Sequence, residues 1–210
     1  VPETTDYVRW LCRSLEVDLI ELETPPEVYQ DIVLGPTRQG FPGPAMHHIT
    51  YHRLKSQRLQ ELQRDYSKRG QRILLVSGVR ENESTRRKMQ IGSKEHEPPR
   101  GRLGRCAWAS PIVHWTGYEM ISFREEYEVP RSPVSDKLHR SGECLCGAFA
   151  KPQEINEIAF WYPETAQYIH SLEEEATSLG KRYHAWGHGT GRMEKSPGLL
   201  CSDCQPRLVE

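Results

Sequence analysis

The chain has 210 residues, which is enough for one domain with a core, or for one domain and a small appendage. Its 28 Lys and Arg residues nearly balance its 29 Asp and Glu residues, and the formal net charge of -1 excludes a strong overall attraction to nucleic acid. No apolar run reaches the roughly 20 residues of a membrane-spanning helix, and residues 1–5 do not resemble a signal peptide. We therefore expect a cytoplasmic protein that does not bind membranes.

The first part of the chain predicts a helix, a strand and a second helix. Apolar residues at helical spacing predict a helix over 5–15, and the branched apolar run 17–22 predicts a buried strand. Residues 24–44 are rich in Pro and Gly and predict a loop. A long polar helix is expected over 47–69, with Gly70 as its C-cap.

The strongest strand pattern of the chain follows at residues 72–76 (RILLV). Its uninterrupted apolar character is typical of a parallel strand that is covered on both faces. Residues 81–107 are strongly polar and predict a loop or a flexible excursion. Thr116 and Glu119 have the spacing of a capping box, which predicts a helix that extends to about Tyr127.

The remaining elements complete the pattern of an α/β fold. Residues 130–142 predict a loop, residues 154–179 a helix in two pieces around Pro163, and residues 183–191 a second loop. Alternation of strands and helices indicates a parallel sheet. A doubly wound sheet usually has about five strands, and only two or three are evident here. We therefore expect a parallel sheet that is incomplete at its N-terminus.

The segment after the 72–76 strand is the first candidate site, because open α/β sheets bind ligands at the carboxyl ends of their strands. Gly78 allows the backbone to approach a ligand closely. Arg80 and Arg86 offer forked donors for phosphate or sulfate, and Ser84 offers a hydroxyl. An ordinary polar turn between a strand and a helix is the alternative interpretation.

Basic and histidine side chains on the 47–69 helix form a second candidate. Lys55 and Arg58 lie one helical turn apart and point the same way, although a solvated basic face is the commoner explanation. His48 and His52 are four residues apart, a spacing that a metal ion could bridge. No acidic motif accompanies the two histidines, so structural or surface roles are favoured for them.

Four of the six cysteines form two close pairs, Cys144 with Cys146 and Cys201 with Cys204. Two thiolate pairs that are distant in sequence can meet as a four-sulfur site, which suits zinc or an iron–sulfur cluster. Four reduced thiols that pack as small hydrophobic groups, or a redox disulfide within the second pair, are the alternatives. The spacing of the other two cysteines does not favour a role as ligands.

Five segments stand in a characteristic order along the chain: residues 2–7 (PETTDY), 77–86 (SGVRENESTR), 111–116 (PIVHWT), 130–136 (PRSPVSD) and 141–149 (SGECLCGAF). This ordered set resembles the motifs of the phosphoadenosine phosphosulfate (PAPS) reductase family, which belongs to the PP-loop, or adenine nucleotide α-hydrolase-like, superfamily. Each segment alone is a weak match, whereas the ordered set spans most of the chain and is fairly specific.

The resemblance implies a Rossmann-like sheet that binds ATP or a sulfonucleotide such as PAPS. It divides the chain into a nucleotide-binding domain over 1–140 and a Cys-containing, metal-binding and helical region over 141–210. Members that transfer sulfur to DNA or tRNA carry an iron–sulfur cluster, so a 4Fe–4S cluster is expected here, with Zn²⁺ as the alternative. By analogy, the nucleotide or its phosphate groups are bound by Lys55, Ser77, Gly78, Arg80, Glu83, Ser84 and Arg86.

The favoured function is nucleotide-dependent sulfur transfer or adenylation, with a sulfur-donor protein and a DNA or tRNA acceptor as further partners. The family's phosphate loop, S-G-G-x-D-S, and the reductases' C-terminal E-C-G-L-H segment do not occur in the sequence. PAPS reduction by a catalytic thiol is therefore an alternative. A zinc-stabilised, non-catalytic nucleic-acid-binding module is a further one.

Overall fold

The computed structural model describes residues 1–83, 96–100, 106–139 and 145–188, and the backbone alone for residues 83 and 96–100. The described residues fall into two compact units. Residues 1–58 and 131–188 form the helical unit, and residues 59–130 form the strand unit. Within the described ranges, none of the helices combines the length and the apolar character needed to cross a bilayer.

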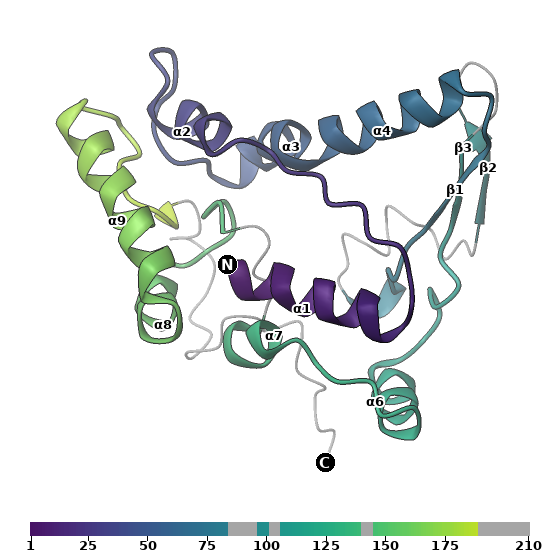
Figure 1. Cartoon of the computed structure of the whole chain (residues 1–210). Helices are drawn as coiled ribbons and strands as arrows, with labels where there is room; N and C mark the ends of the chain where they lie inside the picture. The colour runs from purple at the N-terminus through teal and green to yellow at the C-terminus, as the bar shows by residue number, and fades with distance from the viewer. Residues whose placement is uncertain (84–95, 101–105, 140–144, 189–210) are drawn as a thin grey trace. The chain divides into compact units, whose positions relative to one another are not determined.

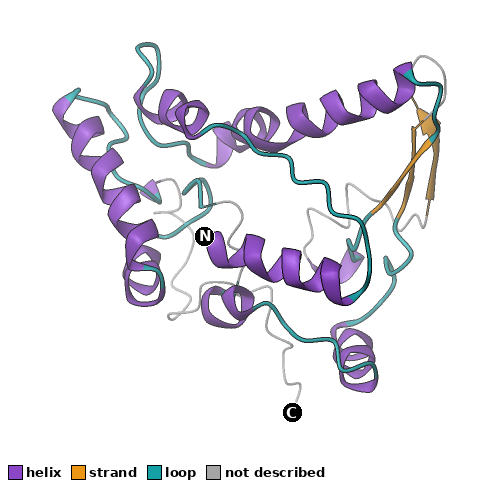
Figure 2. Ribbon diagram, in the orientation of Figure 1, coloured by secondary structure: helices purple, strands orange, loops and turns teal. Residues whose placement is uncertain are grey.

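Short helices joined by turns make up most of the regular structure of the helical unit (Figure 2). Proline occupies the first turn of several of them, where its fixed φ favours the helix and its missing N–H has no intrahelical partner to lose. The elements are α1 (Pro2–Ser14), α2 (Pro26–Leu34), η1 (Pro44–Met46), α3 (His47–Tyr51), η2 (His52–Ser56), α7 (Pro133–Leu138), α8 (Glu154–Trp161) and α9 (Pro163–Ser178).

The core of the helical unit is formed by α2, α7, α8 and α9 together with two aromatic side chains from loops. Phe41 is 1% exposed and Trp186 is 2% exposed, and they are the largest fully buried side chains of the described residues. α8 and α9, which are neighbours in Figure 1, pack against each other, and α9 begins at Pro163. The predicted two-piece helix is thus confirmed. Burial of these large rings contributes to the stability of this unit together with the aliphatic side chains of the helices.

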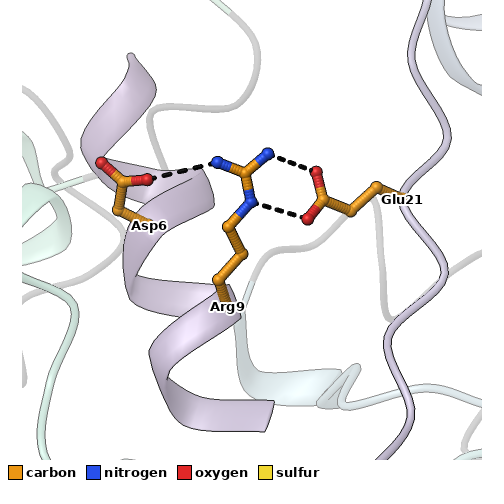
Figure 3. A network of polar contacts seen from close by, with 3 residues as sticks. All are labelled: Asp6, Arg9 and Glu21. Carbon is orange, nitrogen blue, oxygen red and sulfur yellow. Dashed lines mark hydrogen bonds and ion pairs between the residues drawn. The ribbon is translucent and has the colours of Figure 1, made fainter. Parts of the chain in front are cut away.

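The predicted strand over 17–22 is wrong, since these residues form an irregular extended segment with exposed apolar side chains. Side-chain interactions hold this segment beside α1 (Figure 3). Arg9 donates from Nε to Oε1 of Glu21 over 2.6 Å and from Nη2 to Oε2 over 2.7 Å, and it also contacts Asp6. This bidentate pairing lowers the pKa of Glu21. It holds residues 17–22 in place through side chains and not through pairing with a strand.

Two predicted loops contain helices, so those predictions are also wrong. The 24–44 loop contains α2 and the 130–142 loop contains α7. Both helices begin at the first residue that follows an extended residue, with Pro26 and Pro133 at the first helical position. Proline is favoured at the first position of a helix, although it interrupts a helix at interior positions. The predicted loops followed from the second property alone.

The predicted long helix over 47–69 is confirmed as the continuous run of α3, η2 and α4 (Gln57–Lys68). The η2 part is a turn of π-helix, a form that is rare and is found mainly as single turns within α-helices. Gly70 ends the run at a φ of 80°, and the N–H of Gln71 donates to the carbonyl of Tyr66 over 3.1 Å. The expected glycine cap is thus confirmed.

The strand unit contains a three-stranded sheet with the order β1-β3-β2 (Figure 1). β1 pairs in parallel with β3, with Ile73 opposite Cys106 and Val76 opposite Ala109, whereas β2 is antiparallel to β3. The predicted loop over 81–107 is wrong in part, because it contains β2 and the first two residues of β3. The elements of this unit besides α4 are β1 (Ile73–Val76), η3 (Glu81–Glu83), β2 (His96–Arg100), β3 (Cys106–Ala109) and α6 (Gly117–Glu126).

β1 is a parallel strand, as predicted, but it is not covered on both faces. Leu74 is 61% exposed and Val76 is 65% exposed, while Ile73 and Leu75 are half-buried. The expectation of a strand buried on both sides is therefore wrong for the described residues. The fold class is mixed α/β with one parallel strand pair, and a complete Rossmann-like sheet stays a prediction.

The predicted capping box before α6 is confirmed. The backbone N–H of Thr116 donates to Oε2 of Glu119 over 2.7 Å, and the N–H of Glu119 donates to Oγ1 of Thr116 over 3.2 Å. These contacts hold the pKa of Glu119 below its usual range, chiefly through the backbone N–H and then through the hydroxyl of Thr116. The start of α6, which follows the end of β3, is thereby fixed.

Candidate functional site

The carboxyl ends of β1 and β3 lie side by side because the two strands are parallel and adjacent. Ser77 follows β1 and Ser110 follows β3, and their hydroxyl oxygens are hydrogen-bonded at 2.8 Å. The N–H of Ser77 donates to the carbonyl of Ala109 over 2.8 Å and extends the ladder by one bond. Two hydroxyl groups therefore stand together at the edge where parallel sheets of α/β proteins bind ligands.

The two segments remain joined beyond the strand ends. The N–H of Glu81 donates over 2.9 Å to the carbonyl of Val113, whose side chain is fully buried. Gly78 is exposed, and a Cβ at that position would lie 3.8 Å from Cδ1 of Ile112, an ordinary contact distance. The strand-end site is defined here by Ser77, Gly78, Arg80, Glu81, Ser110 and His114.

A carboxylate and an imidazole meet within the strand-end site. Nδ1 of His114 lies 3.2 Å from Oε1 of Glu81. The Glu81 side chain is 19% exposed, whereas that of His114 is 50% exposed. A partly buried carboxylate orients the ring and favours the tautomer with its proton on Nδ1. The pair joins the segment after β1 to the segment after β3 through side chains as well as through backbone.

Three of the predicted nucleotide-binding residues, Ser77, Gly78 and Arg80, lie within four positions directly after β1, so their proximity follows from the sequence alone. Glu83 is the last residue of η3, where only its backbone is described. Lys55 belongs to the helical unit and not to the strand unit. Two further predicted residues, Ser84 and Arg86, lie outside the described residues.

Ser110, His114 and the role of Glu81 at this site were not predicted from the sequence. Residues 111–116 were recognised as a motif, but their alignment with residues 77–81 depends on the register of β1 and β3. The apolar pattern before Ser110 is the short run Cys106–Ala109, which is too brief to predict a strand. One sequence signal for the second half of the site was present. The motifs at residues 77–86 and 111–116 each follow a strand and precede a helix or turn, which is the order expected of two segments at the carboxyl ends of parallel strands.

Lys55 and Arg58 line a groove of about 1160 Å³ within the helical unit. The same groove is lined by three carboxylate side chains and by aromatic rings, so its charge is mixed. Tyr162 is one of the rings, and its buried hydroxyl has no hydrogen-bond partner among the described residues. Burial, and to a lesser extent the charge of Glu3, raise the pKa of that hydroxyl. The groove does not have the purely basic lining expected of a phosphate site.

The described part of the cysteine-containing segment is held firmly within the helical unit. Cys146 is 6% exposed, and its carbonyl accepts a hydrogen bond from the hydroxyl of Tyr29 over 3.2 Å. The carbonyl of Leu145 accepts from Nε1 of Trp186 over 2.8 Å. Gly147 has a φ of 80°, and a Cβ there would lie 2.7 Å from Cδ1 of Trp186. Side chains distant in sequence thus fix the backbone on both sides of the Cys146 thiol.

The rest of the predicted four-sulfur site, Cys144, Cys201 and Cys204, lies outside the described residues. Within the described ranges, no group of three or more His, Cys, Asp or Glu side chains is arranged to hold a metal ion. His48 places Nδ1 3.1 Å from the carbonyl of Ala45, a local backbone contact that fits the structural role favoured for it.

Comparison of the chain with models of protein families, with curated proteins and with solved structures gives no match.

Proposed function

We propose that the strand-end site binds the phosphate or sulfate groups of an adenine nucleotide, ATP or a sulfonucleotide, in an enzyme of the PAPS reductase type. The observation that carries this proposal is the hydrogen bond between Ser77 and Ser110. These residues belong to two motifs, after β1 and after β3, that are separate in sequence and adjacent at the carboxyl ends of parallel strands. That edge is where open α/β sheets bind nucleotides.

The chemistry of the strand-end site suits an anionic ligand. The hydrogen bond between Ser77 and Ser110 uses the proton of one hydroxyl and leaves the other hydroxyl proton to donate to a ligand. The guanidinium of Arg80 can donate in pairs to phosphate or sulfate oxygens. Gly78 has no side chain to keep a ligand from the backbone. The His114 imidazole, when protonated, adds a further cationic donor, and Glu81 orients it.

The reaction class proposed is nucleotide-dependent sulfur transfer or adenylation. In such a reaction an acceptor attacks the α-phosphate of ATP and pyrophosphate leaves. The terminal sulfur of a persulfide on the donor protein then displaces AMP from the acceptor, and a second thiol of the donor releases the product by thiol–disulfide exchange. A DNA or tRNA acceptor is proposed on the family resemblance alone. The strand-end residues would hold the nucleotide during both steps through the hydrogen bonds described above.

We further propose a four-Cys metal centre formed by Cys144, Cys146, Cys201 and Cys204. The described ligand fits this role, because the Cys146 thiol is buried and its backbone is held by Tyr29 and Trp186. A rigid backbone around a thiolate reduces the entropy lost on metal binding. Four sulfur ligands suit a 4Fe–4S cluster, and they also suit Zn²⁺.

Calorimetric titration of the 210-residue chain with ATP and with PAPS tests the nucleotide proposal. We expect Arg80→Gln to weaken nucleotide binding by about tenfold or more, since a charge-assisted hydrogen bond contributes roughly 1.5–3 kcal/mol. The matched control is Arg131→Gln, which removes an exposed arginine of the helical unit that pairs with Asp136. The control should bind as the wild type does.

Equal affinity in wild type, Arg80→Gln and Arg131→Gln would contradict the proposed site, as would the absence of binding of either nucleotide. Release of sulfite from PAPS with reduced thioredoxin would replace sulfur transfer with PAPS reduction. Salt-dependent binding of DNA or tRNA without any affinity for nucleotide would favour the non-catalytic module.

Metal analysis after anaerobic purification tests the four-Cys centre. We expect Cys146→Ser to lose most of the bound metal, while Cys106→Ser retains it because the spacing of Cys106 does not favour ligation. Stoichiometric iron and sulfide in the wild type would support the cluster, and stoichiometric zinc would support the alternative. Equal metal content in both variants, or no metal in the wild type, would contradict the proposed centre.

A further inference from the structure

A cavity of about 460 Å³ lies within the helical unit, apart from the groove that contains Lys55. Its volume falls within the roughly 300–1,000 Å³ that is usual for small-molecule sites. The walls come from the segment between α2 and α3, from the start of α3, and from two rings near residue 185. The side chains that matter for its chemistry are Ile32, Phe41, Met46, Ile49, Tyr183 and His188.

Backbone hydrogen bonds hold the two walls together. The N–H of Phe41 donates to the carbonyl of Tyr183 over 2.7 Å, and the N–H of Tyr183 donates to the carbonyl of Gln39 over 2.7 Å. Gly40 forms a parallel bridge with Tyr183 at a φ of 114°, and a Cβ there would lie 2.1 Å from the Tyr183 carbonyl oxygen. The cavity is therefore preformed, which reduces the entropy that a ligand must overcome on binding.

The lining is apolar and aromatic. Phe41 is 1% exposed and Ile32 is 7% exposed, so they form a dry inner wall. The rings of Tyr183 and His188 are stacked, with centroids 4.4 Å apart and planes 10° apart. Nε2 of His188 donates to the carbonyl of Phe41 over 2.8 Å, which fixes the ring in place. The guanidinium of Arg182 also lies over the Tyr183 ring, 5.2 Å from its centroid. An aromatic ligand would therefore pack against the ring surface that the stacked pair leaves towards the cavity.

Charged groups are scarce in the lining. Arg38 is the one Lys or Arg among the described lining residues, and no Asp or Glu lines the cavity. The buried hydroxyl of Thr50 already donates to the carbonyl of Met46 over 3.2 Å. An ionised ligand would lose its hydration without a matching set of partners, whereas an uncharged ring would lose little.

We propose that this cavity binds an uncharged, planar heteroaromatic molecule, which packs against the Tyr183–His188 pair. The ligand is distinct from the nucleotide of the strand-end site in both charge and location. The proposal therefore stands whether or not the strand-end site binds a nucleotide.

Ligand-observed NMR with indole as the probe tests the proposal on the 210-residue chain. We expect indole to bind the wild type saturably. Tyr183→Phe should bind within about threefold of the wild type because it keeps the stacked ring, whereas Tyr183→Ala should bind about tenfold more weakly. The backbone bonds of residue 183 remain in both variants.

Two further variants separate loss of the site from loss of the fold. Ile49→Trp fills the cavity from its half-buried position in α3 and should abolish indole binding while the chain stays folded. Tyr168→Ala, which removes a ring from the other groove, should leave indole binding unchanged. No binding by the wild type, or equal binding by the wild type, Tyr183→Ala and Ile49→Trp, would overturn the proposal. Displacement of indole by ATP would likewise overturn the separation of the two sites.

Discussion

The helical unit and the strand unit differ in how their apolar side chains are buried. In the helical unit, Phe41 and Trp186 are almost completely enclosed by helices and loops. In the strand unit, Leu74 and Val76 of β1 and Trp108 of β3 are 40% exposed or more. We infer that the helical unit contributes most of the stability of the described residues, and that the proposed nucleotide site lies in the less tightly packed unit.

The largest expected effect on stability is at Gly40 of the helical unit. Gly40→Ala places a Cβ 2.1 Å from the carbonyl oxygen of Tyr183 and adds strain at a φ of 114°. We expect the free energy of unfolding to fall by about 3 kcal/mol or more, as measured by urea denaturation. Gly180→Ala is the matched control, because Gly180 also has a positive φ but has open space around its Cβ direction. A loss no larger than that of the control, about 1–2 kcal/mol, would show that the bridge does not stabilise the unit.

The next effect concerns the anchor of the Cys146 segment. Trp186→Phe removes the Nε1 donor and leaves the partly buried carbonyl of Leu145 without it. We expect a loss of about 2 kcal/mol in the free energy of unfolding, together with a lower metal content. Tyr29→Phe removes the weaker 3.2 Å bond to the Cys146 carbonyl and should cost less. Unchanged metal content in the Trp186 variant would contradict a positioning role for this ring.

The capping box of α6 gives a smaller effect within the strand unit. Thr116→Ala should destabilise the protein by about 1 kcal/mol, because the N–H of Glu119 loses its acceptor. Thermal and urea unfolding measure this loss. Ser132→Ala is the control, since the Ser132 side chain makes no capping bond at the start of α7. Equal losses in the two variants would contradict the capping role of Thr116.

The Thr116–Glu119 capping box also predicts that the stability of the folded chain depends on pH. The pKa of Glu119 is lowered in the folded chain by the backbone N–H and then by the hydroxyl of Thr116. Because the pKa of Glu119 is lower in the folded chain than in the unfolded chain, its ionised carboxylate stabilises the fold at pH values above the unfolded pKa. This contribution to the free energy of unfolding is lost as the pH falls through the folded pKa. Stability measured across acidic pH should therefore decline less steeply in Glu119→Gln than in the wild type. Identical pH profiles would rule out this contribution.

The smallest effect on stability is expected at Gly78 of the strand-end site. A Cβ at this position meets only an ordinary 3.8 Å contact with Ile112, so Gly78→Ala should unfold with nearly the wild-type free energy. Nucleotide affinity should fall nevertheless, because the added methyl group keeps a ligand from the backbone. Gly117→Ala, whose Cβ would lie in open space, is the control for both measurements. Unchanged affinity in Gly78→Ala would mean that no ligand approaches the backbone there.

Local sequence rules predicted the elements that depend on neighbouring residues. The capping box at Thr116, the break at Pro163 and the glycine cap at Gly70 all act within a few residues, and all are confirmed. The rules failed for residues 17–22, where an apolar run predicted a buried strand. Its extended shape is held by the Arg9–Glu21 pair, and its apolar side chains are exposed.

Of the strand-end site, only the residues that follow β1 were predicted from the sequence. Ser77, Gly78 and Arg80 follow the strongest apolar run, and that run is β1. Ser110 and His114 were missed as site residues because they reach the site through the register of β1 and β3, which pairs residues 33 apart. The contact of Trp186 with the Cys146 segment spans 41 residues and likewise has no local signal.

An amide chemical-shift map of the ¹⁵N-labelled chain, recorded during titration with ATP and with PAPS, locates the bound nucleotide residue by residue. We expect the largest changes on residues 77–81 and 110–114 together, because the two segments form one strand-end site. The Gly78→Ala variant should show the same pattern at higher nucleotide concentration. Changes confined to the helical unit, or no changes at saturating nucleotide, would contradict a nucleotide site at the ends of β1 and β3.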